Sequence, residues 1–260
     1  MASAIIGGLI RQSWNPDRIH VIEPWEEQRQ RLAHTWQVQA CASTSTAELD
    51  RCQLVIWAIK PQSFLEAATQ TLPYLHPEAL HLSVAAGIRS DTIAQWLHTE
   101  RIVRAMPNTP ALVGLGMTGL FARAGISMAE RQHVENILHP TGRILWVDEE
   151  RQLDAVTALS GSGPAYVFYF LEAMTEAGTA LGLSPTQAHE LAVGTFVGAA
   201  TLAQNSNEPP SVLRQRVTSK GGTTYAALTH LQDTKTGDHF KTAIHAAAQR
   251  AAELGDAFGK

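Results

Sequence analysis

The sequence predicts an α/β domain with a doubly wound parallel sheet, followed by an all-α domain. Up to about residue 147, short β-branched runs alternate with helical patterns, and this alternation is typical of a parallel sheet. From residue 148 onward Ala, Leu and Glu dominate and the β-branched runs disappear. A chain of 260 residues is long enough to bury two cores. We therefore place the domains at residues 1–147 and 148–260.

The first domain contains four candidate strands with helices between them. The clearest is Gln53–Ile59, a nearly continuous apolar run of the kind buried on both faces of a parallel sheet. Pro61 ends it because proline removes a ladder donor. The other strands are expected at Ile19–Glu23, Leu80–Ala85 and Arg101–Ala105, and the helices at Ala2–Gln12, Trp25–Trp36 and Asp91–Leu97.

The second domain is expected to be helical throughout, because turn signals separate long Ala- and Leu-rich patterns. Gly194 and Gly198 lie in one of these patterns and permit close helix packing, either within the chain or between subunits. The expected helices are Gln152–Leu159, Pro164–Leu181, Pro185–Gln204, Ser211–Val217, Thr223–Leu231 and Asp238–Phe258.

Composition excludes several classes of protein. The net charge is −4 and the basic residues are scattered, which argues against nucleic acid or an anionic membrane as a partner. The longest apolar stretch, Leu191–Ala203, is too short to cross a bilayer. No basic residue precedes the N-terminal apolar run, as it would in a signal peptide. With two cysteines, which we interpret as buried thiols, these features predict a cytoplasmic protein.

Two kinds of catalytic site are disfavoured by the motifs. The eleven histidines are dispersed without metal-ligand spacing, so no metal is expected. The run Gly161-Ser-Gly163 resembles a nucleophile elbow but lacks the preceding strand that strains the serine, so a hydrolase is disfavoured.

The carboxyl ends of the predicted strands are the expected ligand-binding edge of a doubly wound sheet. Gly87 lets a flat ring or a sugar approach closely, and Lys60 is a partner for ribose or phosphate oxygens. Alternatively, these are a tight turn and an exposed cap, and Asn108 forms an Asx turn instead of pointing its amide into the cleft. The candidate residues at these ends are Glu23, Ala58, Ile59, Lys60, Pro61, Ala85, Ala86, Gly87 and Asn108.

The stretch Arg216–Tyr225 gathers hydroxyls and glycines before a predicted helix. Backbone N–H groups converging at a helix N-terminus hold a small carboxylate. Alternatively, Thr223 or Thr224 is an N-cap and the glycines are turn residues. The candidate binding residues are Ser219, Gly221, Gly222, Thr223 and Thr224.

Together these segments resemble the pyrroline-5-carboxylate reductase family over essentially the whole chain. Five short runs match in the family's order and spacing, which makes the resemblance specific. The runs are Val55–Pro61, Ser83–Gly87, Arg104–Pro110, Ala158–Tyr166 and Val217–Thr224.

The resemblance implies a Rossmann-like domain that binds NADPH or NADH, and a helical domain that pairs chains into a homodimer or larger oligomer. It implies reduction of 1-pyrroline-5-carboxylate to L-proline, with Ser219 and Thr224 as catalytic residues and the Ser219–Thr224 loop holding the substrate. The strand-end residues then bind the cofactor. Glu23 would accept hydrogen bonds from the ribose hydroxyls and repel a 2′-phosphate, so NADH is expected to compete well with NADPH.

The sequence departs from the family at its start. The family opens with a strand and a Gly-x-Gly-x-x-[Gly/Ala] loop, whereas Gly7 and Gly8 lie in the body of the first predicted helix. We therefore expect the first strand of the sheet to be missing and the working protein to be longer. The alternatives are a non-catalytic homologue that lacks cofactor binding, or another imine or hydroxyacid reductase on this scaffold. Such a hydroxyacid reductase needs a lysine acid, and Lys220 is the only lysine near the loop.

Overall fold

A computed structural model describes residues 1–258, and the chain divides into two units. Unit 1 comprises Met1–Gly163 together with the chain from Ala247 onward, and unit 2 comprises Pro164–Ala246. This division by contacts differs from the expected domain boundary at residue 147, because the segment after that boundary and the end of the last helix lie with unit 1. The boundary drawn from the sequence stays a prediction.

The larger sheet of unit 1 has five strands within residues 1–258, in the order β3-β4-β5-β6-β7. Strands β3, β4 and β5 are parallel, as expected, and β6 and β7 are parallel to each other, but β5 and β6 are antiparallel. The prediction of a wholly parallel sheet is therefore wrong at β6, where the chain returns through a short connection instead of a helical crossover. The strands are β3 (Leu54–Trp57), β4 (Leu80–Ser83), β5 (Ile102–Met106), β6 (Gly116–Ala122) and β7 (Gly142–Trp146).

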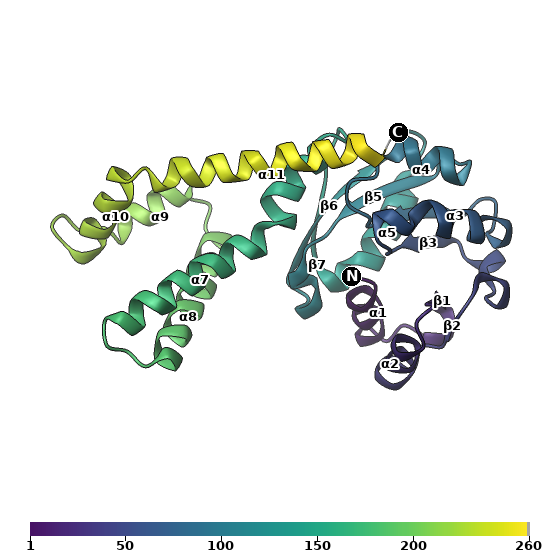
Figure 1. Cartoon of the computed structure of the whole chain (residues 1–260), viewed down its shortest axis with the longest axis horizontal. Helices are drawn as coiled ribbons and strands as arrows, with labels where there is room; N and C mark the ends of the chain where they lie inside the picture. The colour runs from purple at the N-terminus through teal and green to yellow at the C-terminus, as the bar shows by residue number, and fades with distance from the viewer. Residues whose placement is uncertain (259–260) are drawn as a thin grey trace. The chain divides into compact units, whose positions relative to one another are not determined.

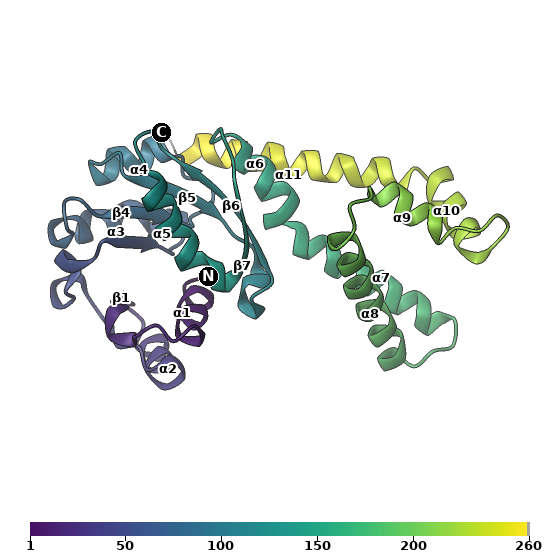
Figure 2. The ribbon, with the colours of Figure 1, turned by 180° about the vertical axis from the view of Figure 1, so that it is seen from behind.

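A second, two-stranded sheet is formed by β1 (Val21–Ile22) and β2 (Ala40–Cys41), which are parallel. Within the described residues β1 does not pair with β3, and Figures 1 and 2 show β1 and β2 beside the larger sheet. The break between the two sheets lies where the sequence predicts a missing central strand. That missing strand stays a prediction.

Helices cover the sheets of unit 1. Helix α1 contains Gly7 and Gly8, as expected, and both serve packing: a Cβ on Gly7 would lie 2.6 Å from the Trp36 ring, and one on Gly8 2.7 Å from Pro140. These two glycines therefore let neighbouring elements approach α1. The helices are α1 (Ala2–Arg11), α2 (Glu26–Trp36), α3 (Phe64–Thr71), α4 (Ser90–Leu97), α5 (Met128–Leu138) and α6 (Gln152–Val156).

Strand β4 lies at the centre of the core, and all four of its residues are buried. Leu82 is fully buried, as is Phe64 of α3. His81 is also buried, and it accepts a hydrogen bond at Nδ1 from the Trp57 indole of β3, 3.1 Å away. This bond satisfies a polar pair inside the apolar layer.

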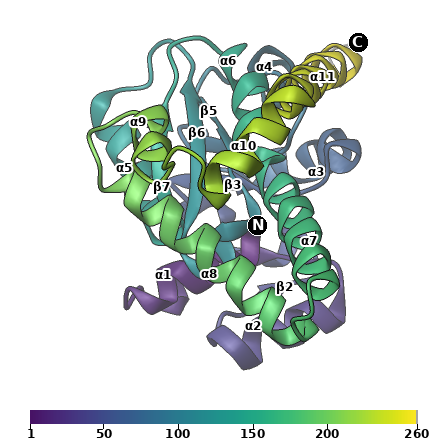
Figure 3. The same cartoon turned by 90° about the vertical axis from the view of Figure 1, so that its left-hand side faces the viewer.

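Unit 2 is helical, as predicted, and Figure 3 shows its helices in green and yellow. Helix α8 begins and ends at the expected residues, because Ser184 and Gln187 form a capping box and Pro185 fits the first turn. A π-helical turn, Thr157–Gly161, precedes α7. The helices are α7 (Gly163–Ala180), α8 (Pro185–Gln204), α9 (Pro210–Arg216), α10 (Thr223–Asp233) and α11 (Thr236–Phe258), whose last residues lie in unit 1.

Among residues 1–258, no helix has the length and the apolar character needed to span a membrane.

Candidate active site

The carboxyl ends of β3, β4 and β5 lie at one edge of the larger sheet, because these strands are parallel. Three of the four predicted strand-end groups follow these strands: Ala58–Pro61, Ala85–Gly87 and Asn108. The structure therefore gathers them at the edge where doubly wound sheets bind ligands. Glu23 follows β1, at the corresponding end of a strand in the smaller sheet.

The segment after β3 presents one cation. Lys60 is exposed, whereas Ala58 and Ile59 are half-buried and Ile59 packs against the core. The carbonyl of Lys60 accepts a hydrogen bond from the Ser63 N–H at 3.0 Å, which begins a short turn at Pro61. The Lys60 ammonium is thus held at the strand end and remains accessible to an anion.

The segment after β4 is only partly open. Ala85 is buried and its N–H donates to Ser83 Oγ at 3.3 Å, while Ala86 is exposed. Gly87 has φ +76°, which favours glycine, and a Cβ there would lie 3.3 Å from Leu254 Cβ. The space that we expected to admit a ring or a sugar beside Gly87 is therefore filled on that side by α11. Ala86 is the accessible residue of the three.

Asn108 joins three segments of unit 1. Its Nδ2 donates to the Ser160 carbonyl at 3.1 Å, and its Oδ1 accepts from the Met117 N–H at 2.9 Å. These partners lie far along the chain, so the alternative of an Asx turn is wrong. A cofactor contact by this amide would compete with bonds that fasten the end of β5 to β6 and to the π-helical turn.

Glu23 has a basic neighbour that the sequence analysis did not expect. Its Oε1 accepts from the Trp25 N–H at 3.0 Å. Arg29 of α2 reaches back, and its Nη1 donates to the carbonyls of Glu23 at 2.9 Å and Pro24 at 2.6 Å. The carboxyl end of β1 thus carries both a carboxylate and a guanidinium. The spacing from strand end to first helical turn was the available signal.

The loop Ser219–Thr224 of unit 2 leads directly into α10. The N-cap residue is Gly222, with no side-chain cap, so the alternative in which Thr223 or Thr224 caps the helix is wrong. Gly221 has φ +77°, and a Cβ on Gly222 would lie 2.6 Å from Ser219 Oγ. The loop therefore requires its glycines.

This loop has the features of a small anion site. The first N–H groups of a helix have no intrahelical acceptor, and no acidic residue occupies the first turn of α10. The Gly222 N–H already donates to the Ser219 carbonyl at 3.0 Å. The N–H groups of Thr223 and Thr224, with the nearby Ser219 hydroxyl, are then the donors for a bound carboxylate.

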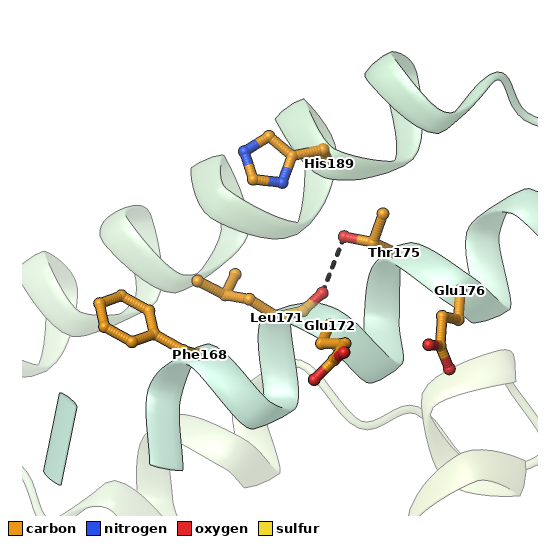
Figure 4. Close-up of a pocket in the computed structure, with 6 residues that line it drawn as sticks. All are labelled: Phe168, Leu171, Glu172, Thr175, Glu176 and His189. Atoms are coloured by element: carbon orange, nitrogen blue, oxygen red, sulfur yellow. Dashed lines mark hydrogen bonds between the residues drawn. The ribbon is translucent and has the colours of Figure 1, made fainter. Parts of the chain in front are cut away.

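Unit 2 also contains a pocket of about 340 Å³ between α7 and α8, which the sequence analysis did not identify. Figure 4 shows Phe168 and Leu171 of α7 on its apolar side, with His189 of α8 across from them. Glu172, Thr175 and Glu176 complete the lining. The pocket belongs to a broader exposed apolar surface, since no residue of α7 is buried and Phe168 is 63% exposed.

A mixed sheet with ligand-binding strand ends, followed by a helical unit that has an anion-binding loop, defines a two-domain dinucleotide-dependent oxidoreductase. Comparisons with known proteins agree. Residues 1–87 match the family model "NADP oxidoreductase coenzyme F420-dependent", and residues 150–254 match "Pyrroline-5-carboxylate reductase dimerisation".

Individual relatives narrow the class to one family. The chain is 41% identical over 261 aligned residues to pyrroline-5-carboxylate reductase of Pseudomonas aeruginosa, covering 100% of this chain and 95% of the relative. The solved structure of the Coxiella burnetii reductase is 35% identical, with a TM-score of 0.90 over 97% of this chain and 94% of that one. The Plasmodium falciparum reductase, solved with NADP bound, is 25% identical, with a TM-score of 0.86 and the same coverage. The chain belongs to the pyrroline-5-carboxylate reductase family.

Proposed function

We propose that the strand ends of unit 1 hold the dinucleotide and that the Ser219–Thr224 loop of unit 2 holds the substrate. The chain is an NAD(P)H-dependent oxidoreductase that reduces 1-pyrroline-5-carboxylate to L-proline, the last step of proline biosynthesis. The observation that carries this function is family membership along the full length of the chain, at 41% identity to a reductase of that name.

The strand-end residues suit a dinucleotide. Lys60 and Arg29 supply positive charge for phosphate oxygens, and Glu23 supplies an acceptor for ribose hydroxyls. Ala86 is small and exposed, so its backbone can approach a flat ring. When bound, the reduced nicotinamide supplies the hydride. The remaining cofactor residues proposed from the sequence, Ala58, Ile59, Pro61, Ala85, Gly87 and Asn108, shape these segments or contact the cofactor through their backbones.

The substrate loop positions the imine. Its carboxylate accepts hydrogen bonds from the Thr223 N–H and the Ser219 hydroxyl, at the positive end of α10. Gly221 and Gly222 leave room for the ring because they carry no side chain. The Thr224 hydroxyl bonds the ring nitrogen, directly or through water, and so orients the protonated C=N bond for attack at carbon. Holding the reacting atoms in this geometry lowers the barrier without a strong side-chain acid.

The chain functions as a homodimer or a larger oligomer of itself. This proposal is supported by the dimerisation family model over residues 150–254 and by the exposed apolar faces of α7 and α8. A cytoplasmic location stays a prediction from composition.

Replacement of Thr224 tests the proposed site. Thr224→Ala should lower kcat about a hundredfold, because one oriented hydrogen bond to the reacting group is lost. The Kd for NADPH, measured by fluorescence titration, should stay unchanged. Thr229→Ala is the matched control, since that hydroxyl lies later in α10 and bonds the Tyr225 carbonyl at 2.9 Å. Wild-type turnover in Thr224→Ala would remove the hydroxyl from the mechanism.

A further inference from the structure

The last turns of α11 lie against the segment that follows β4. A Cβ on Gly87 would be 3.3 Å from Leu254 Cβ and 3.4 Å from the Phe258 ring. Phe258 also packs against the core cluster that contains Ala85 and Ile88. We call residues 254–258 the C-terminal clamp. It covers one side of the segment whose other exposed point is Ala86.

Arg89 fastens this segment to the clamp. Its Nη2 donates to Asp256 Oδ1 at 2.9 Å, and its Nη1 lies 3.9 Å from Asp154 Oδ2 of α6. The guanidinium lies flat against the helix: a Cβ on Gly255 would be 3.1 Å from both Arg89 Cζ and Nη2. Glycine at position 255 therefore provides the space that this side chain occupies.

The next residue is anchored separately. The Ser90 N–H and hydroxyl donate to the two carboxylate oxygens of Glu150, at 2.5 and 2.7 Å. Glu150 also accepts from Arg104 of β5 at 2.6 Å, and both of these charged side chains are largely buried. The start of α4 is thus fixed to the sheet. The position of the preceding residues, Ala86 and Gly87, depends on contacts with the C-terminal clamp.

We propose that the C-terminal clamp sets the position of the β4 strand end for the cofactor, with Arg89 as the positioning residue. This rests on the proposed assignment of that strand end to the dinucleotide. Arg89 acts through the backbone of Ala86 and Gly87. Helix α11 begins in unit 2, after the α10 segment that carries the substrate loop. The clamp therefore fastens to the cofactor unit a continuous helix that starts in the substrate-binding unit.

The test compares Arg89→Met and Arg89→Lys in the full chain. Misplacement of a binding segment by a fraction of an ångström to an ångström should raise the Kd for NADPH about tenfold or more in Arg89→Met. The KM for the imine substrate should change less than about twofold, and Arg89→Lys should recover part of the loss because it keeps the charge opposite Asp256. Arg250→Met is the matched control, because it removes an exposed pair with Glu253 on the same helix.

Two further measurements separate positioning from general destabilisation and from a wrong site. Hydrogen exchange should rise at the amides of residues 85–89 in Arg89→Met and stay unchanged in β5, whereas global unfolding would raise both. Ala86→Trp should abolish NADPH binding by blocking the strand end. If Ala86→Trp abolishes binding while Arg89→Met binds NADPH as wild type does, the clamp is overturned and the proposed cofactor site stands. If Ala86→Trp binds normally, the cofactor assignment of the β4 end fails, and the clamp proposal fails with it.

Discussion

Glu23 and Arg29 place opposite charges at the carboxyl end of β1, where the family binds the adenosine end of its cofactor. The carboxylate disfavours a 2′-phosphate, but its Oε1 is occupied by the Trp25 N–H. The guanidinium is held by two carbonyls through Nη1 alone, so its other nitrogens face outward from that contact. The choice between NADH and NADPH is therefore a balance of these two side chains.

Replacing each residue should shift this balance in opposite directions. Glu23→Ser removes the repulsion and should raise the ratio of kcat/KM for NADPH to that for NADH. Arg29→Met should lower the ratio about tenfold, because one charge-assisted hydrogen bond to the 2′-phosphate is lost. Arg31→Met, on the same helix, serves as the control. An unchanged ratio in both Glu23→Ser and Arg29→Met would mean that the adenosine lies elsewhere.

At this scale the sequence predicted which backbone segments form the candidate site, and the partners of their side chains escaped it. The start of α10 at Thr223 was predictable because the two glycines interrupt any earlier helix. The partner of Asn108 was not, since Ser160 lies 52 residues away. Arg89 is similar, because its partner Asp256 is brought close only by the folded end of α11.

Single elements were predictable where local signals agree and were missed where packing decides. The bounds of α8 follow from a capping box and a proline, both of which are local. Strands β6 and β7 were missed because each contains glycine, which weakens strand patterns. In β6 a Cβ on Gly119 would lie 2.7 Å from Val156 Cγ1, so this glycine makes room for α6. Such a requirement has no periodic signature.

The β3–β4 pair contains a pH-sensitive contact. Burial, and the nearby charge of Arg101, lower the pKa of His81 from its ordinary value of 6.5 to about 4. Between these values the unfolded chain binds a proton that the folded chain does not. The free energy of unfolding should therefore be constant above pH 6.5 and fall by about 3 kcal/mol as the pH is lowered to 4.

Urea unfolding at pH 7 and pH 4.5 measures this loss. His81→Gln should reduce the difference in unfolding free energy between the two pH values, because its amide still offers an acceptor to Trp57 and does not titrate. Carboxylates elsewhere contribute to both proteins, so the comparison isolates His81. Identical pH dependence in wild type and His81→Gln would show that the histidine protonates equally in the folded and unfolded chains.

For the whole molecule, α8 offers a direct test of assembly. A Cβ on Gly194 or Gly198 would meet no atom within 4 Å, so these glycines are not needed for packing inside the described chain. They permit close approach of a second copy. Gly198→Leu should therefore weaken the dimer, while α8 itself gains about 1 kcal/mol of helix propensity.

Light scattering over a range of concentrations measures the dimer, and circular dichroism measures the fold. Gly178→Ala is the contrasting variant, because a Cβ there would lie 2.9 Å from Ala188 Cβ within the same chain. It should lower the thermal stability of each protomer, whereas Gly198→Leu should affect assembly alone. Dimers of wild-type strength in Gly198→Leu would move the interface away from this face of α8.

The catalysed reaction is the most direct test of the assigned function. Purified chain should be mixed with 1-pyrroline-5-carboxylate and NADPH, and both the loss of absorbance at the nicotinamide band and the proline formed should be followed. We predict one proline for each NADPH oxidised, with no oxidation when the substrate is omitted and strongly reduced turnover in Thr224→Ala. NADPH binding without proline formation, or no binding at all by the folded dimer, would contradict the reductase assignment and favour a non-catalytic homologue.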